Sequence, residues 1–362
     1  MNIIDRIRGS LIGGAAGDAL GYAVEFITLA DIINRYGSSG VTEYKLTSGK
    51  ALISDDTQMT LFTANGLLYA HTRGCLRGIL GPMENYICDA YRNWYAMQCG
   101  IPIDEWHKVA WLCDVPELAQ NRAPGTTCMS ALGGGQIGTL KNPINNSKGC
   151  GGVMRVAPIG LFGVYDADKA FNCACAAAAI THGNPLGWLP AGILSRVINR
   201  IVFDNVDLTE ALYESINHML INYPGEDSRH LAELLYQAVQ FISNERADAD
   251  NIKSLGEGWV GDEALAIAVY SALKYQNDFD KAIICAVNHS GDSDSTGAIA
   301  GNIVGALCGY ESMSPKWKTD LELHDVILEI ADDLYKVTLA DFYRIAEEDI
   351  DWDKKYVNCM RV

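Results

Sequence analysis

The fold of this chain is decided by residues 291–309, which read GDSDSTGAIAGNIVGALCG. Glycines recur four residues apart in this segment and again near the N-terminus, at Gly297, Gly301, Gly305 and Gly309 and at Gly13, Gly17 and Gly21. This spacing places each set on one face of a helix. A helical glycine costs about 1 kcal/mol relative to alanine, so we expect close backbone contact to offset that cost. The pattern predicts two central, tightly crossed helices, with the residues that precede them deep in the molecule.

The rest of the chain also shows helical periodicity. Period-3.6 patterns outnumber period-2 patterns, and runs rich in Val, Ile and Thr are short and isolated. One helix is expected from Ser54 to about Thr72 and another over Glu263–Tyr275, each with an apolar stripe. No linker rich in Pro, Ser or like charge divides the chain. The sequence therefore predicts an all-α fold, a single compact multi-helix domain spanning residues 1–362.

The longest segment without charged side chains, Ala170–Ser195, raises the question of a membrane span. Asn184, Pro185 and Pro190 interrupt it, so we expect a buried helix, a loop and a second buried helix. Asp18 interrupts the apolar N-terminal run, which argues against a signal peptide or anchor. These features predict a protein that does not use a membrane.

Charge and cysteine content exclude further classes of protein. The 362 residues carry 28 basic and 45 acidic side chains, a net charge of −17 that repels phosphate backbones and anionic headgroups. General nucleic-acid binding is therefore not expected. The 11 cysteines are scattered and odd in number, which suits neither a disulfide framework nor a zinc module. A cytoplasmic location fits this cysteine usage.

Two acidic clusters each open a predicted helix: Ser54-Asp55-Asp56-Thr57 and Asp292-Ser293-Asp294-Ser295-Thr296. Either cluster alone can be explained as helix capping, because Ser, Thr and Asp accept bonds from the N–H groups of a first turn. Together they indicate one site that collects oxygen ligands. Four carboxylates in one place would repel each other, and two divalent cations would neutralise them. Oxygen ligands favour Mg²⁺, Mn²⁺ or Ca²⁺ over zinc, and the seven histidines include no H-E-x-x-H motif.

These clusters belong to four blocks through which the chain resembles the ADP-ribosylglycohydrolase family. That family includes the dinitrogenase-reductase-activating glycohydrolases and the animal ADP-ribosylarginine hydrolases. The blocks occur in the order GSLIGGAAGDALG at residues 9–21 with Glu25 beyond, SDDT at 54–57, GCGGVMRVAP at 149–158 and GDSDSTG at 291–297. The motif-bearing part runs from about residue 5 to 310, and residues 311–362 are expected to form a C-terminal helical extension. Residues 204–258 carry no matching motif.

The resemblance implies an ADP-ribose cleft with two Mg²⁺ ions at its base, with Mn²⁺ as an alternative. The positions that match metal ligands are Ser54, Asp55, Asp56, Asp292, Asp294 and Ser295. Thr57 and Thr296 match capping positions. Asp55 or Asp56 is expected to take a proton from water. Glu25 resembles a family carboxylate next to the metals, which could hold metal in the resting state or deliver a proton to the leaving group. The alternative for Glu25 is an ordinary surface charge.

A glycine-rich loop is the best candidate for contact with a pyrophosphate, because its backbone N–H groups can approach closely. With the segment near the family's adenosine ribose, it gives the expected substrate-binding residues Gly149, Cys150, Gly151, Gly152, Met154 and His182. Lys148 or Arg155 could add charge, although Arg155 could equally anchor the loop to carboxylates within the fold. Trp259 could stack on adenine, but a tryptophan is more often part of the core. The G-x-G-x-x-G match at 133–138 follows no convincing strand, so a Rossmann site is not expected.

The expected function is Mg²⁺-dependent hydrolysis at C1″ of an ADP-ribosylated side chain, with ADP-ribose and an ADP-ribosylated protein as partners. Arginine is favoured as the acceptor, while serine and nucleobase acceptors stay open. Two alternatives are a non-catalytic ADP-ribose-binding protein on the same scaffold and a dinuclear-metal phosphohydrolase, which would release AMP. No long heptad run requires a partner subunit, so a monomer suffices.

Overall fold

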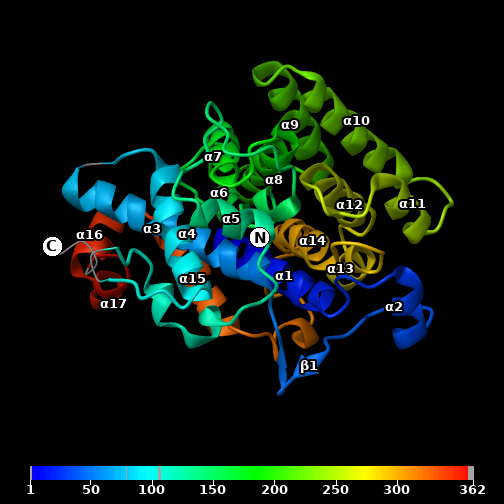
Figure 1. Ribbon diagram of the computed structural model, residues 1–362, viewed down its shortest axis with the longest axis horizontal. Coiled ribbons are helices and arrows are strands. Elements are labelled where there is room, and N and C mark those ends of the chain that lie inside the picture. The colour runs from blue at the N-terminus through cyan, green and yellow to red at the C-terminus, as the bar shows by residue number, and fades with distance from the viewer. Residues whose placement is uncertain (1, 79, 105–106, 358–362) are drawn as a thin grey trace.

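The computed structural model describes residues 2–78, 80–104 and 107–357, and its regular structure is almost entirely α-helical (Figure 1). The longer helices are α1 (Ile3–Tyr22), α3 (Asp55–Arg77), α4 (Met83–Gln98), α7 (Ala167–Ala179), α8 (Pro185–Asp204), α9 (Leu208–Asn222), α10 (Glu226–Phe241), α12 (Gly261–Lys274), α14 (Ser293–Cys308) and α15 (His324–Lys336). The shorter ones are α2 (Leu29–Tyr36), α5 (Thr126–Gly133), α6 (Ala157–Gly160), α11 (Asp248–Leu255), α13 (Phe279–Val287), α16 (Phe342–Glu348) and α17 (Ile350–Trp352). A two-stranded antiparallel hairpin, β1 (Leu46–Thr47) and β2 (Lys50–Ala51), is the sheet of the described residues. The expected all-α class is confirmed.

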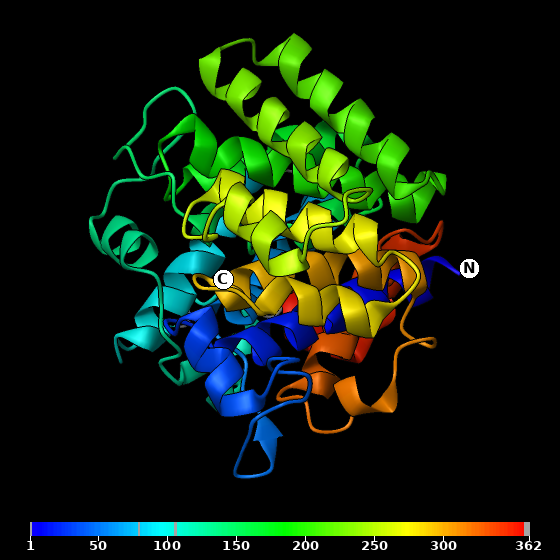
Figure 2. The same cartoon turned by 90° about the vertical axis from the view of Figure 1, so that its right-hand side faces the viewer.

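The helices α1 and α14 form the centre of the molecule, as the glycine pattern predicted. Figures 1 and 2 show them side by side in the middle, and Figure 1 shows α9 and α10 on one side of them and α16 and α17 on another. A Cβ atom on Gly17 would lie 1.9 Å from the carbonyl oxygen of Gly297, and one on Gly301 would lie 2.0 Å from that of Gly13. The two backbones therefore touch without intervening side chains.

The register of this contact is antiparallel, and it positions the site. Gly9 meets Gly305 near one end of the pair, and at the other end Gly21 meets Ser293. The end of α1 is thereby held against the start of α14. Any acidic residue that begins α14 must lie close to the loop that leaves α1.

The expected helices are present with different limits. Ser54 caps α3 as predicted, but the helix continues to Arg77, where Gly78 in the left-handed region ends it with φ of 65°. Helix α12 covers the predicted segment. In the uncharged stretch two buried helices occur, as expected, but Pro190 does not break the second one. Pro185 starts α8, where its missing N–H costs nothing, and Pro190 lies inside the same helix.

The C-terminal segment packs into the same core as the rest of the chain. Trp352 and Tyr356 are fully buried, and the Trp352 Nε1 atom donates to the Thr72 hydroxyl of α3 at 3.1 Å. The Tyr356 hydroxyl donates to Asp333 of α15 at 2.9 Å. The last residues of the predicted extension, 358–362, lie outside the described residues. None of the described helices combines the length and apolar character needed to cross a membrane.

Candidate active site

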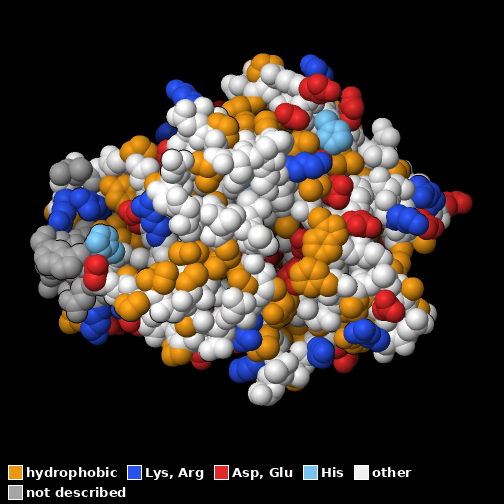
Figure 3. Space-filling view, in the orientation of Figure 1, with side chains coloured by type: hydrophobic (Ala, Val, Ile, Leu, Met, Phe, Trp, Pro, Cys, Tyr) orange, Lys and Arg blue, Asp and Glu red, His pale blue; other side chains and the backbone are white. Residues whose placement is uncertain are grey.

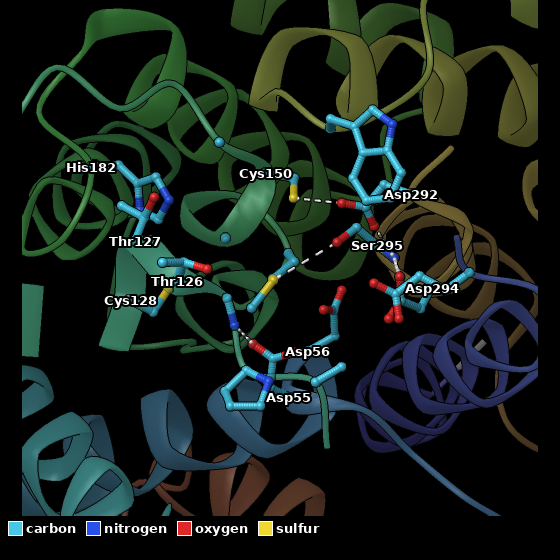
Figure 4. A pocket seen from close by; sticks show the side chains of 18 of the residues that line it. Asp55, Asp56, Thr126, Thr127, Cys128, Cys150, His182, Asp292, Asp294 and Ser295 are labelled. Carbon is cyan, nitrogen blue, oxygen red and sulfur yellow. Dashed lines mark hydrogen bonds between the residues drawn. The ribbon is translucent and has the colours of Figure 1, made fainter. Parts of the chain in front are cut away.

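A cavity of about 360 Å³ opens where the starts of α3, α5 and α14 converge (Figures 3 and 4). Its acidic side is formed by the carboxylates of Glu25, Asp55, Asp56, Asp292 and Asp294, together with Ser295. Its opposite side is formed by residues 123–128, Gly149, Cys150, Gly151, Met154 and His182, and Phe26 and Trp259 complete the lining. The two acidic clusters, separated by more than 230 positions in the sequence, therefore share one cavity.

The first acidic cluster is held by a buried carboxylate that the sequence analysis did not identify as part of the site. Asp18 of α1 is fully buried and accepts the backbone N–H groups of Ser54 and Thr57 at 3.0 and 3.1 Å. The Thr57 hydroxyl also donates to it. These bonds clamp the first turn of α3 against α1. As a result, Asp55 and Asp56 point into the cavity while Thr57 faces away from it.

The second cluster combines capping with exposure to the cavity. The Asp292 side chain accepts the Ser295 N–H at 3.2 Å, which is an N-cap bond for α14. Its other oxygen accepts the Cys150 thiol at 2.8 Å. Thr296 lies behind the cluster and donates its hydroxyl to the Asp292 carbonyl. Asp292 thus caps α14 and also lines the cavity.

Burial and mutual repulsion raise the pKa values of the carboxyl groups in this cavity. The pKa of Asp55 is raised to about 8 by burial, with the charges of Asp18 and Asp292 adding to the effect. Burial and the Asp292 charge likewise raise the pKa of Glu25 to about 8. The pKa values of Asp56 and Asp294 lie well above the ordinary range for the same two reasons. The cavity therefore holds more negative charge than its own polar groups stabilise.

The donor set fits hard divalent cations. The Oδ1 atom of Asp56 and the Oε2 atom of Glu25 are buried without a hydrogen-bond partner, which is costly unless something else satisfies them. Carboxylate and hydroxyl oxygens are the ligands that Mg²⁺ and Mn²⁺ prefer. Within residues 2–78, 80–104 and 107–357, no group of three or more His, Cys, Asp or Glu side chains already has the arrangement of a metal site. A cation would have to draw these carboxylates closer together.

The glycine-rich loop lies against His182. A Cβ atom on Gly151 would lie 3.0 Å from the His182 ring and equally close to the Cys128 sulfur. The imidazole Nδ1 atom is 2.8 Å from the Thr181 hydroxyl. Burial, with the nearby charge of Arg155, lowers the pKa of His182 to about 3. His182 is therefore a neutral group that can offer one ring nitrogen to a ligand.

The side chains of Lys148 and Arg155 do not reach the cavity. Arg155 is fully buried, donates to the Thr181 hydroxyl and the Ala177 carbonyl, and lies over the Tyr91 ring. Arg155 is thus buried beside the loop, but its bonds go to a hydroxyl and a carbonyl rather than to the carboxylates that the anchoring expectation named. Lys148 is exposed to solvent and does not line the cavity. The described lining contains no lysine or arginine at all.

Two predicted site residues lie just behind the cavity wall. Ser54 is fully buried, and its hydroxyl accepts the Asp56 N–H at 3.2 Å as a helix cap. Gly152 packs against the backbone of Gly187, where a Cβ atom would be 2.3 Å from the carbonyl oxygen. Neither lines the cavity. Adjacent motif residues separate in this way because each turn of helix directs neighbouring side chains to different faces.

Sequence reasoning missed the start of α5. The segment Pro124-Gly125-Thr126-Thr127 lines the cavity, and the Gly125 N–H donates to the Asp55 carboxylate at 3.1 Å. The first N–H groups of a helix have no partner within it, so this end suits an anion. The available signal was a proline and a glycine followed by two hydroxyl residues, just before the G-x-G-x-x-G match. The first glycine of that match, Gly133, ends α5, so the match does not follow a strand.

The expectation that Trp259 is a core residue was wrong. Its side chain is 37% exposed and stacks on Phe26, which is 68% exposed, at the edge of the cavity. The Trp259 carbonyl accepts the Cys150 N–H at 3.2 Å, so the tryptophan is tied to the glycine-rich loop. His289, by contrast, is buried behind α14 and bonds to Thr296, as expected of a structural histidine.

Comparisons with known proteins give one consistent family. The family model of the ADP-ribosylglycohydrolases matches residues 1–342. The ADP-ribosyl-[dinitrogen reductase] glycohydrolase of Rhodospirillum rubrum is 25% identical over 338 residues, which cover 89% of this chain and 92% of the relative. The ADP-ribosylarginine hydrolase Tri1 of Pseudomonas putida is 25% identical over 341 residues, covering 92% of this chain and 78% of the relative.

A solved structure has the same fold. It is described as an ADP-ribosylglycohydrolase-related protein complex, and it superposes with a TM-score of 0.63 at 22% sequence identity. The superposition covers 93% of this chain and 99% of the other.

Proposed function

The chain belongs to the ADP-ribosylglycohydrolase family, and we propose that it hydrolyses the C1″ glycosidic bond between ADP-ribose and a modified side chain. Arginine is the acceptor we favour, and Mg²⁺ the cofactor. The observation that carries this proposal is the composition of one cavity, in which five carboxylates face a glycine-rich loop and a helix start without a single described cationic side chain.

This composition suits the two ends of ADP-ribose differently. A pyrophosphate placed against the start of α5 and the Gly149–Gly151 loop would meet backbone N–H groups and the Thr126 and Thr127 hydroxyls rather than lysine or arginine. The distal ribose would then lie over the carboxylates, whose oxygens accept bonds from its hydroxyls. Met154, which lines the cavity between these regions, would pack against the sugar.

Asp55, Asp56, Asp292 and Asp294, with Ser295, would hold the two cations. When bound, these ions supply positive charge that fixes the ribose hydroxyls and lowers the pKa of a coordinated water.

Two carboxyl groups of this chain would carry out the proton transfers of the reaction. Water adds its oxygen to C1″ while the bond from C1″ to the acceptor nitrogen breaks, through a transition state that resembles an oxocarbenium ion. Asp56 would take the proton of the attacking water, because its Oδ1 atom has no partner, whereas one oxygen of Asp55 already accepts the Gly125 N–H. Glu25 would deliver a proton to the leaving nitrogen, because it lines the cavity without belonging to either Asp pair.

The decisive experiment measures free ADP-ribose released from an arginine-ADP-ribosylated protein, with Mg²⁺, with EDTA and with Asp292→Ala. We expect release that requires Mg²⁺ and is lost in Asp292→Ala. Asp325→Ala is a suitable control, because the Asp325 side chain is fully exposed.

Other products would refute parts of the proposal. AMP in place of ADP-ribose would identify a phosphohydrolase. Release only from serine-linked or nucleobase-linked substrates would refute the arginine assignment. Binding of ADP-ribose without release from any of the three would indicate a binding protein.

A further inference from the structure

An exposed aromatic pair stands at the acidic end of the cavity. The rings of Phe26 and Trp259 stack with centroids 5.4 Å apart and an interplanar angle of 22°. They come from segments more than 230 residues apart, and both line the cavity. Figure 3 shows apolar side chains beside acidic ones on this face of the molecule.

Phe26 is unusual both in its backbone conformation and in the exposure of its ring. Its φ of 63° lies in the left-handed region, which bulky side chains rarely adopt. Its ring is also 68% exposed, so this conformation does not serve to bury it in the core. A conformation of this kind persists where the surrounding structure fixes it, and such residues cluster at functional sites.

The pair lies next to the carboxylates, although the Trp259 backbone also bonds to the glycine-rich loop. Phe26 directly follows Glu25 in the loop that leaves α1. Trp259 follows Gly258, where a Cβ atom would lie 3.5 Å from the Asp292 side chain. With the distal ribose over the carboxylates, a group attached to its C1″ atom would leave the cavity beside these rings.

The charge around the rings selects among possible acceptor groups. Glu25 has a buried oxygen without a hydrogen-bond partner, and the described lining offers no lysine or arginine that could donate to it. An N–H group of a guanidinium could donate to this oxygen. A guanidinium is flat enough to stack on an aromatic face and carries the complementary charge. A serine hydroxyl has neither property, and a neutral nucleobase has only the first.

We propose that Phe26 and Trp259 form a stacking platform for the guanidinium of an ADP-ribosylated arginine and thereby set acceptor specificity. The proposal rests on the glycohydrolase function proposed above. It assigns the rings to the acceptor and not to the ADP-ribose moiety.

The test compares Trp259→Ala and Trp259→Phe with the unaltered protein on an arginine-ADP-ribosylated peptide and on free ADP-ribose. Stacking of a cation on a partly desolvated ring predicts about a tenfold fall in kcat/KM for the peptide in Trp259→Ala. Trp259→Phe should restore most of it. The affinity for free ADP-ribose should change by less than about twofold, because only the acceptor contacts the ring.

Tyr213→Ala is the matched control. Tyr213 is 39% exposed and packs against Tyr236 with ring centroids 5.8 Å apart, in a pair that does not line the cavity. Its loss should leave both measurements unchanged.

Two results would overturn the platform: an equal fall in affinity for free ADP-ribose, or no fall in either measurement. Turnover of a nucleobase-linked substrate that depends on Trp259, without turnover of the arginine-linked one, would also overturn it. If the unaltered protein releases ADP-ribose from no substrate, the glycohydrolase proposal fails separately. Calorimetry then measures the affinity for the same peptide and for free ADP-ribose. The platform requires that Trp259→Ala lower the affinity for the peptide, relative to that for free ADP-ribose, about tenfold.

Discussion

Replacing Asp55 by asparagine should stabilise the metal-free protein, even though the change removes a carboxylate that the proposed reaction needs. Asp55 is almost completely buried, and its Oδ2 atom accepts the Gly125 N–H at 3.1 Å. An asparagine side chain has nearly the same shape, and its carbonyl oxygen can keep that bond. The substitution therefore removes mainly the buried negative charge.

The magnitude follows from the raised pKa. Burial and the neighbouring acidic charges raise the pKa of Asp55 from 3.8 to about 8. The folded state therefore binds more protons than the unfolded state between these values, so stability falls as the pH rises through that range. The carboxyl group costs folding about 5 kcal/mol at pH 8 and about 2 kcal/mol at pH 5. Asp55→Asn should recover part of this cost, and more of it at pH 8.

The assay is equilibrium unfolding by urea in EDTA at both pH values, followed by the same measurement at pH 8 with saturating Mg²⁺. Cation binding should then favour the unaltered protein by about 3 kcal/mol at a concentration one hundred times the dissociation constant. The advantage of Asp55→Asn in free energy of unfolding should therefore shrink or change sign.

Asp333→Asn is the control, because Asp333 is equally buried but bonds to Lys336, Lys355 and Tyr356. Removing this satisfied charge should destabilise the protein by about 3 kcal/mol. If Asp55→Asn also destabilises the protein in EDTA at pH 8, the repulsion argument for the cavity is wrong.

Two further predictions concern packing and acid stability. Gly17→Ala should destabilise the protein by at least about 3 kcal/mol in urea unfolding, because the new Cβ atom would lie 1.9 Å from the Gly297 carbonyl oxygen; Gly225→Ala, where nothing lies within 4 Å, should change stability by less than about 1 kcal/mol. Burial lowers the pKa of His182 to about 3, so the unfolded state takes up a proton below about pH 6.5 while the folded state does not, and stability falls with falling pH. Between pH 7 and pH 5 the free energy of unfolding should therefore fall by about 2 kcal/mol less in His182→Gln than in the unaltered protein, as measured by urea unfolding. An equal fall in both proteins would contradict a buried neutral imidazole.

The sequence by itself determined the central helix pair and the meeting of the two acidic clusters. Glycines at a spacing of four leave a helix face without side chains, and only another backbone can pack so closely there; this is why Gly13 and Gly17 predicted their contact with α14. Asp and Ser residues at a helix start can each be explained by capping, but two clusters with two carboxylates each, Asp55-Asp56 and Asp292-Asp294, indicated one shared site.

The tertiary structure alone decided which residues face the cavity. Asp18 lies within an apolar helix, and its role depends on the N–H groups of Ser54 and Thr57 being brought to it from another helix. Arg155 and Lys148 are the cations nearest the glycine-rich loop in sequence, yet one is sealed in the core and the other faces solvent. Burial and the direction of a side chain depend on every element packed around it, and local sequence does not encode them.

The pairing of Phe26 with Trp259 shows the same limit most clearly. Nothing in either segment predicts that the rings will stack, because the contact arises only when the loop that leaves α1 meets the loop before α12, which packs against the start of α14. The glycine spacing determined that the two helices cross, and their antiparallel register determined which side chains meet at the cavity.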